Sequence, residues 1–573
     1  MSVPDWLFDN FLFLPWPGRW FAGPVWHQFS VAATIGLALV ASGLWMLERR
    51  ALSLGCAPPE RRRKAIALVL AALAFLAYFD FFNPNARYPD YYHRHELYHY
   101  YLGAKYSREL GYKRLYACTA IAEVELGFGA HIRQARMTDL SGHNLIVPME
   151  RTYVFSDPGQ CTRHFSDARW QAFKADVSWF EQRSRGEYWE HMRIDHGYNP
   201  PPVWTMTGKL FASLAPAGDH FFKLLAALDV ALQLGALLLI GWAFGWRILA
   251  LAAVFWGCSG PANFFWTGGA FLRQDWYFDL VAALCLARKR KFALSGAALS
   301  WSTLLRVFPV VMFVGAGMCM LCDVLRKRRL VAEYRRFLLG AALAGGLLVG
   351  ASAWVCGVDA YPAFVDHIHS HHETQLTNNM GLETILAHDW AGRMRFTTDE
   401  RLEDSMQPWK EHHAARLELH RPLWLLLCAA VGAWQLWALQ RTRLLWIGMA
   451  LSVPLLMCVL DLTCYYYVFC VALAPLVRVR HELAPAFLAL AGASQVLLGR
   501  FYFIDDRYVA ESWLFCAFGA CVLYALSRPF SVGRLRALVA QASGGSGRGV
   551  AGRLESRSRP TARPRTSDTT RTS

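Results

Sequence analysis

Long uninterrupted runs of apolar residues are the feature that most constrains this chain. They cover residues 31–47, 65–78, 224–244 and 337–355. Several approach the roughly 20 residues that an α-helix needs to cross the hydrocarbon of a bilayer. Only 18% of the residues are charged, whereas soluble domains carry about 25%. The sequence therefore predicts one all-α polytopic membrane protein rather than a string of soluble domains.

The formal net charge of +16 is concentrated in short basic clusters between the apolar runs. These clusters lie at residues 49–50 with 61–64, 288–291, 326–329 with 335–336, 441–443, and 478–480. Arginine and lysine gather in the cytoplasmic loops of membrane proteins. Topology thus accounts for the charge, and we expect no nucleic-acid partner.

Placing every basic cluster in the cytoplasm predicts about 13 transmembrane helices. They cover approximately residues 29–47, 65–82, 221–244, 247–264, 271–287, 292–304, 308–324, 336–356, 422–440, 444–461, 464–478, 483–499 and 510–527. The N-terminus and two large loops, residues 83–220 and 357–421, then lie outside. We call these the first and second large loops. Helical spacing of aromatic residues through 168–182 predicts that the first large loop is ordered and mostly helical.

The two ends of the chain differ from the membrane domain, residues 29–527. Residues 1–28 are rich in Trp and Phe and indicate an interfacial segment rather than a cleaved signal peptide. Residues 528–573 are rich in Gly, Ser, Arg, Pro and Thr, and predict a mostly disordered cytoplasmic tail. The composition and the lack of an N-x-S/T sequon fit a bacterial inner membrane.

Two cysteines, Cys118 and Cys161, fall in the first large loop. They form one disulfide if that side of the membrane is oxidising, and otherwise remain two free thiols.

Acidic side chains stand at the outer end of the second apolar run. Asp80 ends the run, and Asp90 and Glu96 follow within YPDYYHRHELYHYY. Carboxylates at a membrane edge are costly and indicate function. A carboxyl group desolvated there is expected to have a raised pKa, which suits a general base. Alternatively, Asp90 caps a helix, and Glu96 pairs with Arg94 or Lys105.

Basic side chains are expected on the same side of the membrane. TGGAFLRQDWYFD places Arg273 and Asp275 at the outer end of one span, and LLRVFP places Arg306 at another. Pro309 breaks the helix there, which predicts two short helices, 292–304 and 308–324. Guanidinium groups bind phosphate through paired hydrogen bonds, so two such arginines predict a site for a lipid-linked phosphate. The alternative is snorkelling to ordinary headgroups.

Histidines form two groups in the loops. They are His93, His95 and His99 in the first, and His367, His369, His371 and His372 in the second. Their HxH and HH spacings match no defined metal site, so we predict no metal, and one or two histidines in contact with substrate. The chain also lacks a P-loop and a GxGxxG stretch after a strand, so no cofactor is predicted.

The stretch HELYHYYLGAKYSRELGYKRLY resembles the first outer loop of the GT-C superfamily of glycosyltransferases, in particular the polyprenol-phosphate-mannose-dependent mannosyltransferases. The matching positions are Glu96, Tyr100, Gly111 and Tyr116. GAALSWSTLLRVFP, TNNMGLETIL with Asn379, and LTCYYYVFCVALAPLV resemble later parts of these enzymes. The acid is Glu here rather than Asp, and a segment at about 120–200 has no counterpart.

The resemblance implies a GT-C-like fold and transfer of a mannose-like sugar from a polyprenyl-phosphate donor to a glycan or lipid acceptor. Such transfer is inverting and metal-independent. Glu96, or alternatively Asp90, would take the acceptor proton, and Arg273 and Arg306 would bind the donor phosphate. Asp80 is a third catalytic candidate. The other residues expected to contact the substrate or the base are His93, Tyr98, His99, Tyr100, Asp275, Asn379 and, from RIDHGYNPPPVW, Asp195, His196, Tyr198 and Asn199.

Two other classes of protein remain open. One is a secondary transporter or a flippase for lipid-linked glycans, and the other is a non-enzymatic envelope assembly protein. The glycosyltransferase hypothesis requires Glu96 or Asp90 to lie near both Arg273 and Arg306.

Overall fold

The computed structural model describes residues 25–83, 91–141, 144–184 and 186–529. The chain divides into two compact units, Met1–Ser527 and Arg528–Ser573. The tail predicted to be disordered lies almost wholly outside the described residues, as do Asp90 and most of the expected interfacial segment.

Seven helices are long and apolar enough to cross a membrane, among the residues that the structure describes. They are Phe29–Ser53 of α2 (Val25–Ser53), α13 (Asp219–Phe244), Phe308–Lys327 made of η5 (Phe308–Val310) and α18 (Val311–Lys327), α19 (Ala332–Cys356), α23 (Gln407–Leu439), α26 (Leu483–Arg500) and α27 (Ile504–Ser527). Shorter apolar helices are α14 (Trp246–Cys258), α17 (Phe292–Leu305), Leu445–Val459 made of α24 (Leu445–Ala450) and α25 (Val453–Val459), and η6 (Cys464–Arg478). The all-α class is confirmed, whereas the figure of about 13 spans stays a prediction.

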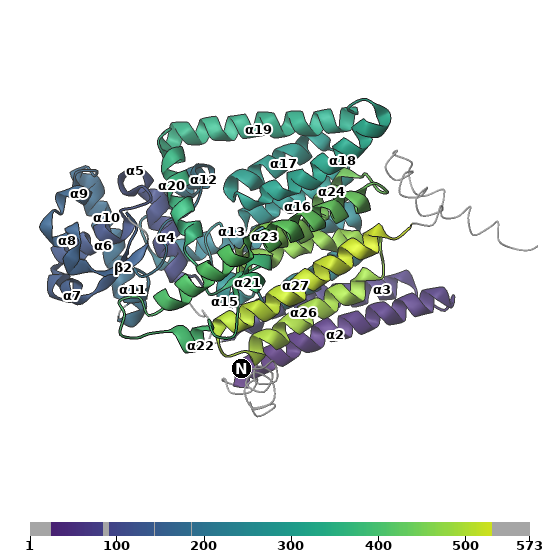
Figure 1. The fold of residues 1–573 in the computed structure, drawn as a ribbon, viewed down its shortest axis with the longest axis horizontal. Helices are drawn as coiled ribbons and strands as arrows, with labels where there is room; N and C mark the ends of the chain where they lie inside the picture. The colour runs from purple at the N-terminus through teal and green to yellow at the C-terminus, as the bar shows by residue number, and fades with distance from the viewer. Residues whose placement is uncertain (1–24, 84–90, 142–143, 185, 530–573) are drawn as a thin grey trace, which may run out of the picture. The chain divides into compact units, whose positions relative to one another are not determined.

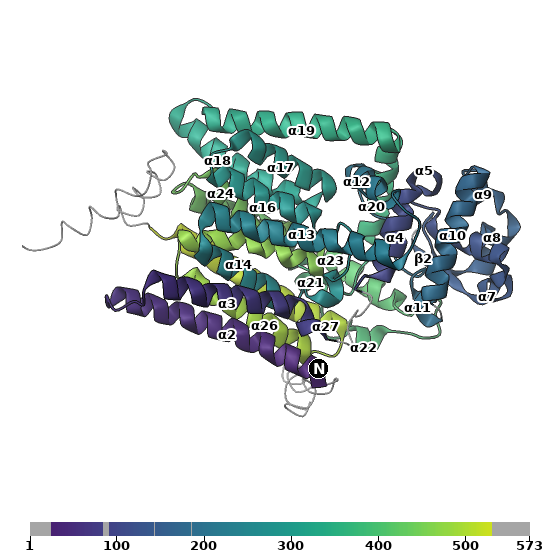
Figure 2. The same cartoon turned by 180° about the vertical axis from the view of Figure 1, so that it is seen from behind.

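The helices pack side by side in one bundle (Figures 1 and 2). Helix α2 lies against α26, α26 against α27, and α17 against α19. Two further helices, α3 (Glu60–Tyr78) and α16 (Asp275–Arg288), overlap predicted spans. The predicted break at LLRVFP is confirmed, because α17 ends at Leu305 and the next helical turn begins at Phe308.

The described part of the first large loop is mostly helical, as predicted, and gathers at one end of the long helices (Figures 1 and 2). Its helices are α4 (Arg94–Lys105), α5 (Ser107–Leu110), α6 (Leu115–Glu123), η3 (Val124–Phe128), α7 (Gly129–Gln134), η4 (Met149–Arg151), α8 (Tyr153–Ser156), α9 (Gly159–Thr162), α10 (Asp167–Arg183), α11 (Glu187–His191) and α12 (Pro202–Ala212). Helix α10 matches the predicted helical spacing. An antiparallel pair of strands, β1 (Arg136–Asp139) and β2 (Leu145–Pro148), was not predicted.

A disulfide joins Cys118 on α6 to Cys161 on α9. Both cysteines are fully buried. The bond decides between the two alternatives that the sequence left open, and it closes a segment with a sequence separation of 43 residues.

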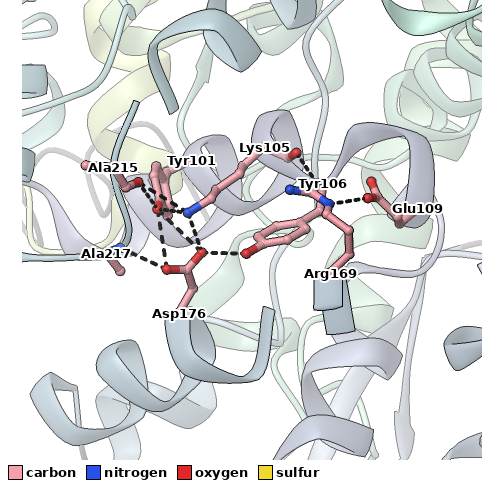
Figure 3. Close-up of polar contacts among 8 residues, drawn as sticks. All are labelled: Tyr101, Lys105, Tyr106, Glu109, Arg169, Asp176, Ala215 and Ala217. Carbon is pink, nitrogen blue, oxygen red and sulfur yellow. Dashed lines mark hydrogen bonds and ion pairs between the residues drawn. The ribbon is translucent and has the colours of Figure 1, made fainter. Parts of the chain in front are cut away.

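A buried polar network fixes the C-terminal end of α4 to α10 (Figure 3). The Lys105 ammonium lies 2.8 Å from the Asp176 carboxylate, and both side chains are at most 10% exposed. The Tyr106 hydroxyl donates to Asp176 at 2.7 Å, and the Ala217 N–H donates at 2.8 Å. A buried charge is stabilised when it is paired and hydrogen-bonded in this way, so α4 has a fixed position.

The second large loop contains α20 (Ala360–Glu373), β3 (Asn379–Met380), α21 (Leu382–Ala387) and α22 (Met394–Thr397). Strand β3 pairs antiparallel with β4 (Leu462–Thr463). A fully buried ion pair of 2.5 Å between Arg393 and Asp506 joins this loop to α27. Two short elements, η2 (Asp80–Phe82) and α15 (Phe264–Thr267), complete the set.

Candidate active site

A cavity of about 970 Å³ opens beside the N-terminal end of α4. Segments far apart in the sequence line it, including η2, α4, residues 195–199, α15 and residues 375–378. The predicted site residues on its wall are Asp80, His93, Glu96, His99, Tyr100, Asp195, His196, Asn199 and Arg273. The structure thus gathers most of the predicted residues in one place.

Glu96 and Arg273 are in direct contact on the cavity wall. The Arg273 Nη2 atom lies 2.7 Å from Glu96 Oε2, and the two side chains are 12% and 1% exposed. The alternative pairings of Glu96 are wrong, because Arg94 donates to the Arg183 carbonyl and Lys105 binds Asp176 on the other side of α4. The predicted proximity of Glu96 to Arg273 is therefore confirmed.

The loop that carries Arg273 is held against the start of α4. The His93 N–H donates to the Gly269 carbonyl at 2.8 Å. Gly269 has φ +72°, and a Cβ there would lie 2.7 Å from the Tyr92 Cα, so this close approach requires glycine. His93 also caps α4, because its Nδ1 accepts the Glu96 N–H at 3.5 Å. The two partners of the ion pair are consequently positioned by backbone contacts.

A residue that sequence reasoning missed, Asp229 of α13, also positions Arg273. Its carboxylate accepts the backbone N–H groups of Arg273 at 3.0 Å and Gln274 at 3.1 Å. Asp229 is buried within an otherwise apolar helix. A lone acid in an apolar run is itself a functional signal and was available in the sequence.

The second predicted arginine, Arg306, reaches the site through Tyr100. The Arg306 guanidinium lies 5.9 Å from the Tyr100 ring and 5.6 Å from the Trp204 ring. Burial raises the pKa of the Tyr100 phenol, Tyr466 raises it further, and both Arg306 and Arg273 oppose this shift. The two guanidinium groups therefore act on one phenol, although Arg306 itself is not on the cavity wall.

Aromatic rings complete this side of the site. The Arg273 guanidinium lies 4.3 Å from the centre of the Tyr465 ring, and that ring lies 4.6 Å from Tyr466. Asp275 begins α16, is buried and lies within electrostatic reach of Arg306. Asp275 accepts the Trp276 N–H at 2.7 Å and does not line the cavity.

Tyr98 does not orient the base, and that prediction is wrong. Its hydroxyl donates to Thr119 at 3.0 Å, and its ring packs 5.2 Å from Trp189. Position i+2 from Glu96 lies about 200° around the helix axis, so Tyr98 points away from the cavity. Tyr100, at i+4, lies on the same face as Glu96.

His99 contacts other partners than Glu96. Its Nδ1–H donates to the His95 carbonyl at 2.7 Å, and its Nε2 lies 2.8 Å from the Tyr116 hydroxyl. Tyr116 in turn accepts the Gly197 N–H at 2.8 Å. Burial lowers the pKa of His99, and Asp195 opposes that shift.

Asp195 is surrounded by three imidazoles. Its carboxylate oxygens lie 3.6 Å from His95 Nε2, 4.0 Å from His99 Nε2 and 3.9 Å from His196 Nε2. Burial acts to raise the pKa of Asp195, but His95, His196 and His99 lower it below its usual range. This cluster brings together residues about 100 positions apart and was not predicted as a unit.

The remaining predicted residues have structural partners. Asp80 accepts from Ser30 and from Asn83. The Oδ1 atom of Asn199 lies 2.6 Å from His367 Nε2. Two predicted contacts fall away from the cavity wall. Asn379 donates to Asp461 at 2.7 Å, and Tyr198 is buried with its hydroxyl 2.7 Å from Thr205.

The second large loop also contributes to the cavity wall. His371 lines it, with its ring 5.1 Å from the His196 ring, and Lys410 lies nearby. Contact of one or two of these histidines with a substrate stays a prediction. Comparison of the chain with family models, curated proteins and solved structures finds no match.

Proposed function

We propose that the chain is an integral-membrane glycosyltransferase that uses a polyprenyl-phosphate-linked, mannose-like sugar and a glycan or lipid acceptor. The observation that supports the proposal is the contact between Glu96 and Arg273 on the wall of a cavity of about 970 Å³. Arg306 joins this pair through Tyr100.

These groups match the two needs of inverting sugar transfer. An acceptor hydroxyl needs a base that removes its proton as it attacks the anomeric carbon. The leaving phosphate needs cations where negative charge collects. Glu96 supplies the base, and Arg273 and Arg306 supply the cations.

The reaction balances without a metal at the reacting carbon. The acceptor oxygen forms a bond to the anomeric carbon from the face opposite the phosphate. The bond from that carbon to the phosphate oxygen breaks, and its electron pair stays on the phosphate. The acceptor proton passes to Glu96. Because Glu96 and the phosphate both bind Arg273, arrival of the donor phosphate opens the ion pair and frees the carboxylate.

The proposed setting is a bacterial inner membrane, with the N-terminus, both large loops and the cavity on the outer side and the C-terminus in the cytoplasm. The basic clusters between the spans support this orientation. Membrane lipids then surround the bundle and present the donor chain.

The test measures sugar transfer by the purified full-length chain in lipid nanodiscs, with polyprenyl-phosphate sugars as donors and a membrane glycolipid extract as acceptor. We expect Glu96→Gln to lower the transfer rate by about 10²–10⁴-fold, the usual contribution of a general base. Arg306→Ala is expected to lower it through weaker phosphate binding.

The matched control is Glu48→Gln. Glu48 also pairs with arginines, at 2.8 Å from Arg63 and 2.6 Å from Arg247, but does not line the cavity. Equal rates for Glu48→Gln and Glu96→Gln would contradict the role of Glu96. Absence of transfer by the wild type from every donor, together with donor movement across the bilayer, would favour a flippase instead.

A further inference from the structure

A second stripe of side chains on α4 faces the same cavity. His95 and His99 are one helical turn apart, beside the stripe formed by Glu96 and Tyr100. Their rings lie 4.8 Å apart. Asp195 comes from a distant segment and meets both. The ligating atoms of His95, His99 and Asp195 all lie within 4.8 Å of one another.

We infer that His95, His99 and Asp195 form a binding site for a divalent metal ion of the zinc class, open to the cavity, which replaces the prediction of no metal from the sequence. HELYH at residues 95–99 also has the HExxH spacing, which places two zinc-binding histidines on one face of a helix. The inference rests on this geometry and does not depend on the proposed sugar transfer. Two imidazoles and one carboxylate are the ligand set of many zinc sites that keep a fourth position for water or substrate. All three residues line the cavity, so an ion has access to them.

The distances suit an ion after a small adjustment. Zinc lies about 2.0–2.2 Å from nitrogen and oxygen ligands, so tetrahedral ligands are roughly 3.3–3.5 Å apart. The Asp195 oxygen lies 3.6 Å from His95 Nε2 and 4.0 Å from His99 Nε2. The two distances to the Asp195 oxygen therefore need to shorten by at most about 0.7 Å, and the imidazole nitrogens already lie within 4.8 Å of each other.

The hydrogen bonds of His99 also fit a ligand. Metal-binding histidines usually donate their other ring N–H to a carbonyl or a carboxylate. His99 does so, because its Nδ1–H donates to the His95 carbonyl at 2.7 Å. Its Nε2 then carries a lone pair. Ion binding would replace the 2.8 Å contact with the Tyr116 hydroxyl, which keeps the Gly197 N–H.

A second cluster, His388 with Asp505 and Asp506, is a poorer candidate. Asp506 already pairs with the buried guanidinium of Arg393 at 2.5 Å. Asp505 accepts the backbone N–H groups of Met394 at 2.8 Å and Asp506 at 2.9 Å. These partners occupy the oxygens that an ion would need. Asp195 also accepts a backbone N–H, that of His196, but its ion-pair neighbours within the described residues are all histidines, and no arginine competes for its oxygens there.

The test titrates the purified full-length chain with Zn²⁺, after treatment with a chelator, in competition with a fluorescent zinc indicator. We expect one Zn²⁺ per chain. His95→Ala and Asp195→Asn are each expected to weaken binding by at least about 100-fold, more than loss of an outer hydrogen-bond partner of a ligand costs. Both side chains are partly exposed, and Asp195→Asn preserves shape, so both variants are expected to fold.

Two controls locate the ion. His131 pairs with Glu190 at 3.2 Å in the same loop without a third ligand, so His131→Ala should bind Zn²⁺ as the wild type does. His388→Ala should also leave binding unchanged. In the wild type, Zn²⁺ should protect His95 but not His131 from diethyl pyrocarbonate, as mapped by mass spectrometry. No stoichiometric binding, unchanged binding by His95→Ala and Asp195→Asn, or loss of binding in His388→Ala would each overturn the inference.

Discussion

Helix α4 carries a buried ion pair near each end, and the two pairs differ in their surroundings. Glu96 and Arg273 meet at 2.7 Å, and Lys105 and Asp176 meet at 2.8 Å. Burial is similar in both pairs. However, Asp176 also accepts hydrogen bonds from neighbouring groups and does not line the cavity of about 970 Å³, whereas Glu96 and Arg273 do.

The comparison shows that burial of an ion pair does not by itself indicate a functional site. A pair whose remaining lone pairs are satisfied, as at Asp176, fixes two helices together. A pair beside a cavity can exchange one partner for a ligand. Access to space, more than burial or distance, therefore distinguishes the two ends of α4.

The largest expected effect comes from a double-mutant cycle at the cavity pair. We expect Glu96→Gln and Arg273→Gln each to lower the transfer rate by about 10²–10⁴-fold. The double variant should be no slower than the slower of the two single variants, because the effects of substitutions at residues that act as one unit are not additive. The measurement is the rate of sugar release from a polyprenyl-phosphate donor.

The control cycle combines Glu96→Gln with Asp176→Asn. Positions 96 and 105 of α4 are roughly 14 Å apart along the helix axis, so the two ion pairs should act independently. The rate of this double variant should equal that of Glu96→Gln alone, per folded molecule. If Asp176→Asn lowered the rate of the Glu96→Gln variant further, both ion pairs would belong to the catalytic unit, and the distinction between the two ends of α4 would be wrong.

The next largest effect is on stability at the other pair. Asp176→Asn leaves the Lys105 ammonium buried without its counter-charge, which costs about 3–5 kcal/mol of the free energy of unfolding. The measurement is unfolding by SDS titration in mixed micelles. Replacing both partners, with Lys105→Met and Asp176→Asn, removes the unpaired charge, keeps an acceptor for Tyr106 and Ala217, and should restore part of the loss. If Asp176→Asn is as stable as the wild type, Asp176 does not fix α4.

Local features of this fold were largely predictable from sequence. Apolar runs and aromatic spacing predicted the long helices and α10, and Pro309 marked the break after Leu305. The expected sidedness of the basic clusters put Glu96 and Arg273 on one side of the membrane, and the structure brings them into contact. Sequence patterns set these features through local chain geometry and solvation.

Partner choice was less predictable, because it depends on packing between distant segments. Nothing local indicates that Asp195 meets His95, or that Lys105 binds Asp176. Tyr98 is a different case, because helical geometry alone would have placed it opposite Glu96. The strands β1 and β2 are too short for a clear alternating pattern.

A smaller effect on stability is expected from the disulfide of α6, the helix that packs against α10 and Asp176. Cys118 lies on α6, which packs against α10, the helix of Asp176. Replacing Cys118 and Cys161 by Ser should lower the free energy of unfolding by about 2–4 kcal/mol, while the transfer rate of the folded protein stays unchanged. Cys56→Ser, at an exposed free cysteine, is the control. A lower transfer rate in the folded double variant would show that the packing of α6 against α10 also affects the cavity.

The smallest effect is expected at Tyr100, which lies between the two arginines. Its ring faces the Arg306 guanidinium at 5.9 Å, a contact worth about 0.5–2 kcal/mol. Tyr100→Leu removes the aromatic face and should raise the KM for the donor by roughly 2–30-fold, because Arg306 is then less well positioned for phosphate. Tyr100→Phe retains the face and should stay close to the wild type. If Phe and Leu weaken donor binding equally, the hydroxyl rather than the ring links Arg306 to the site.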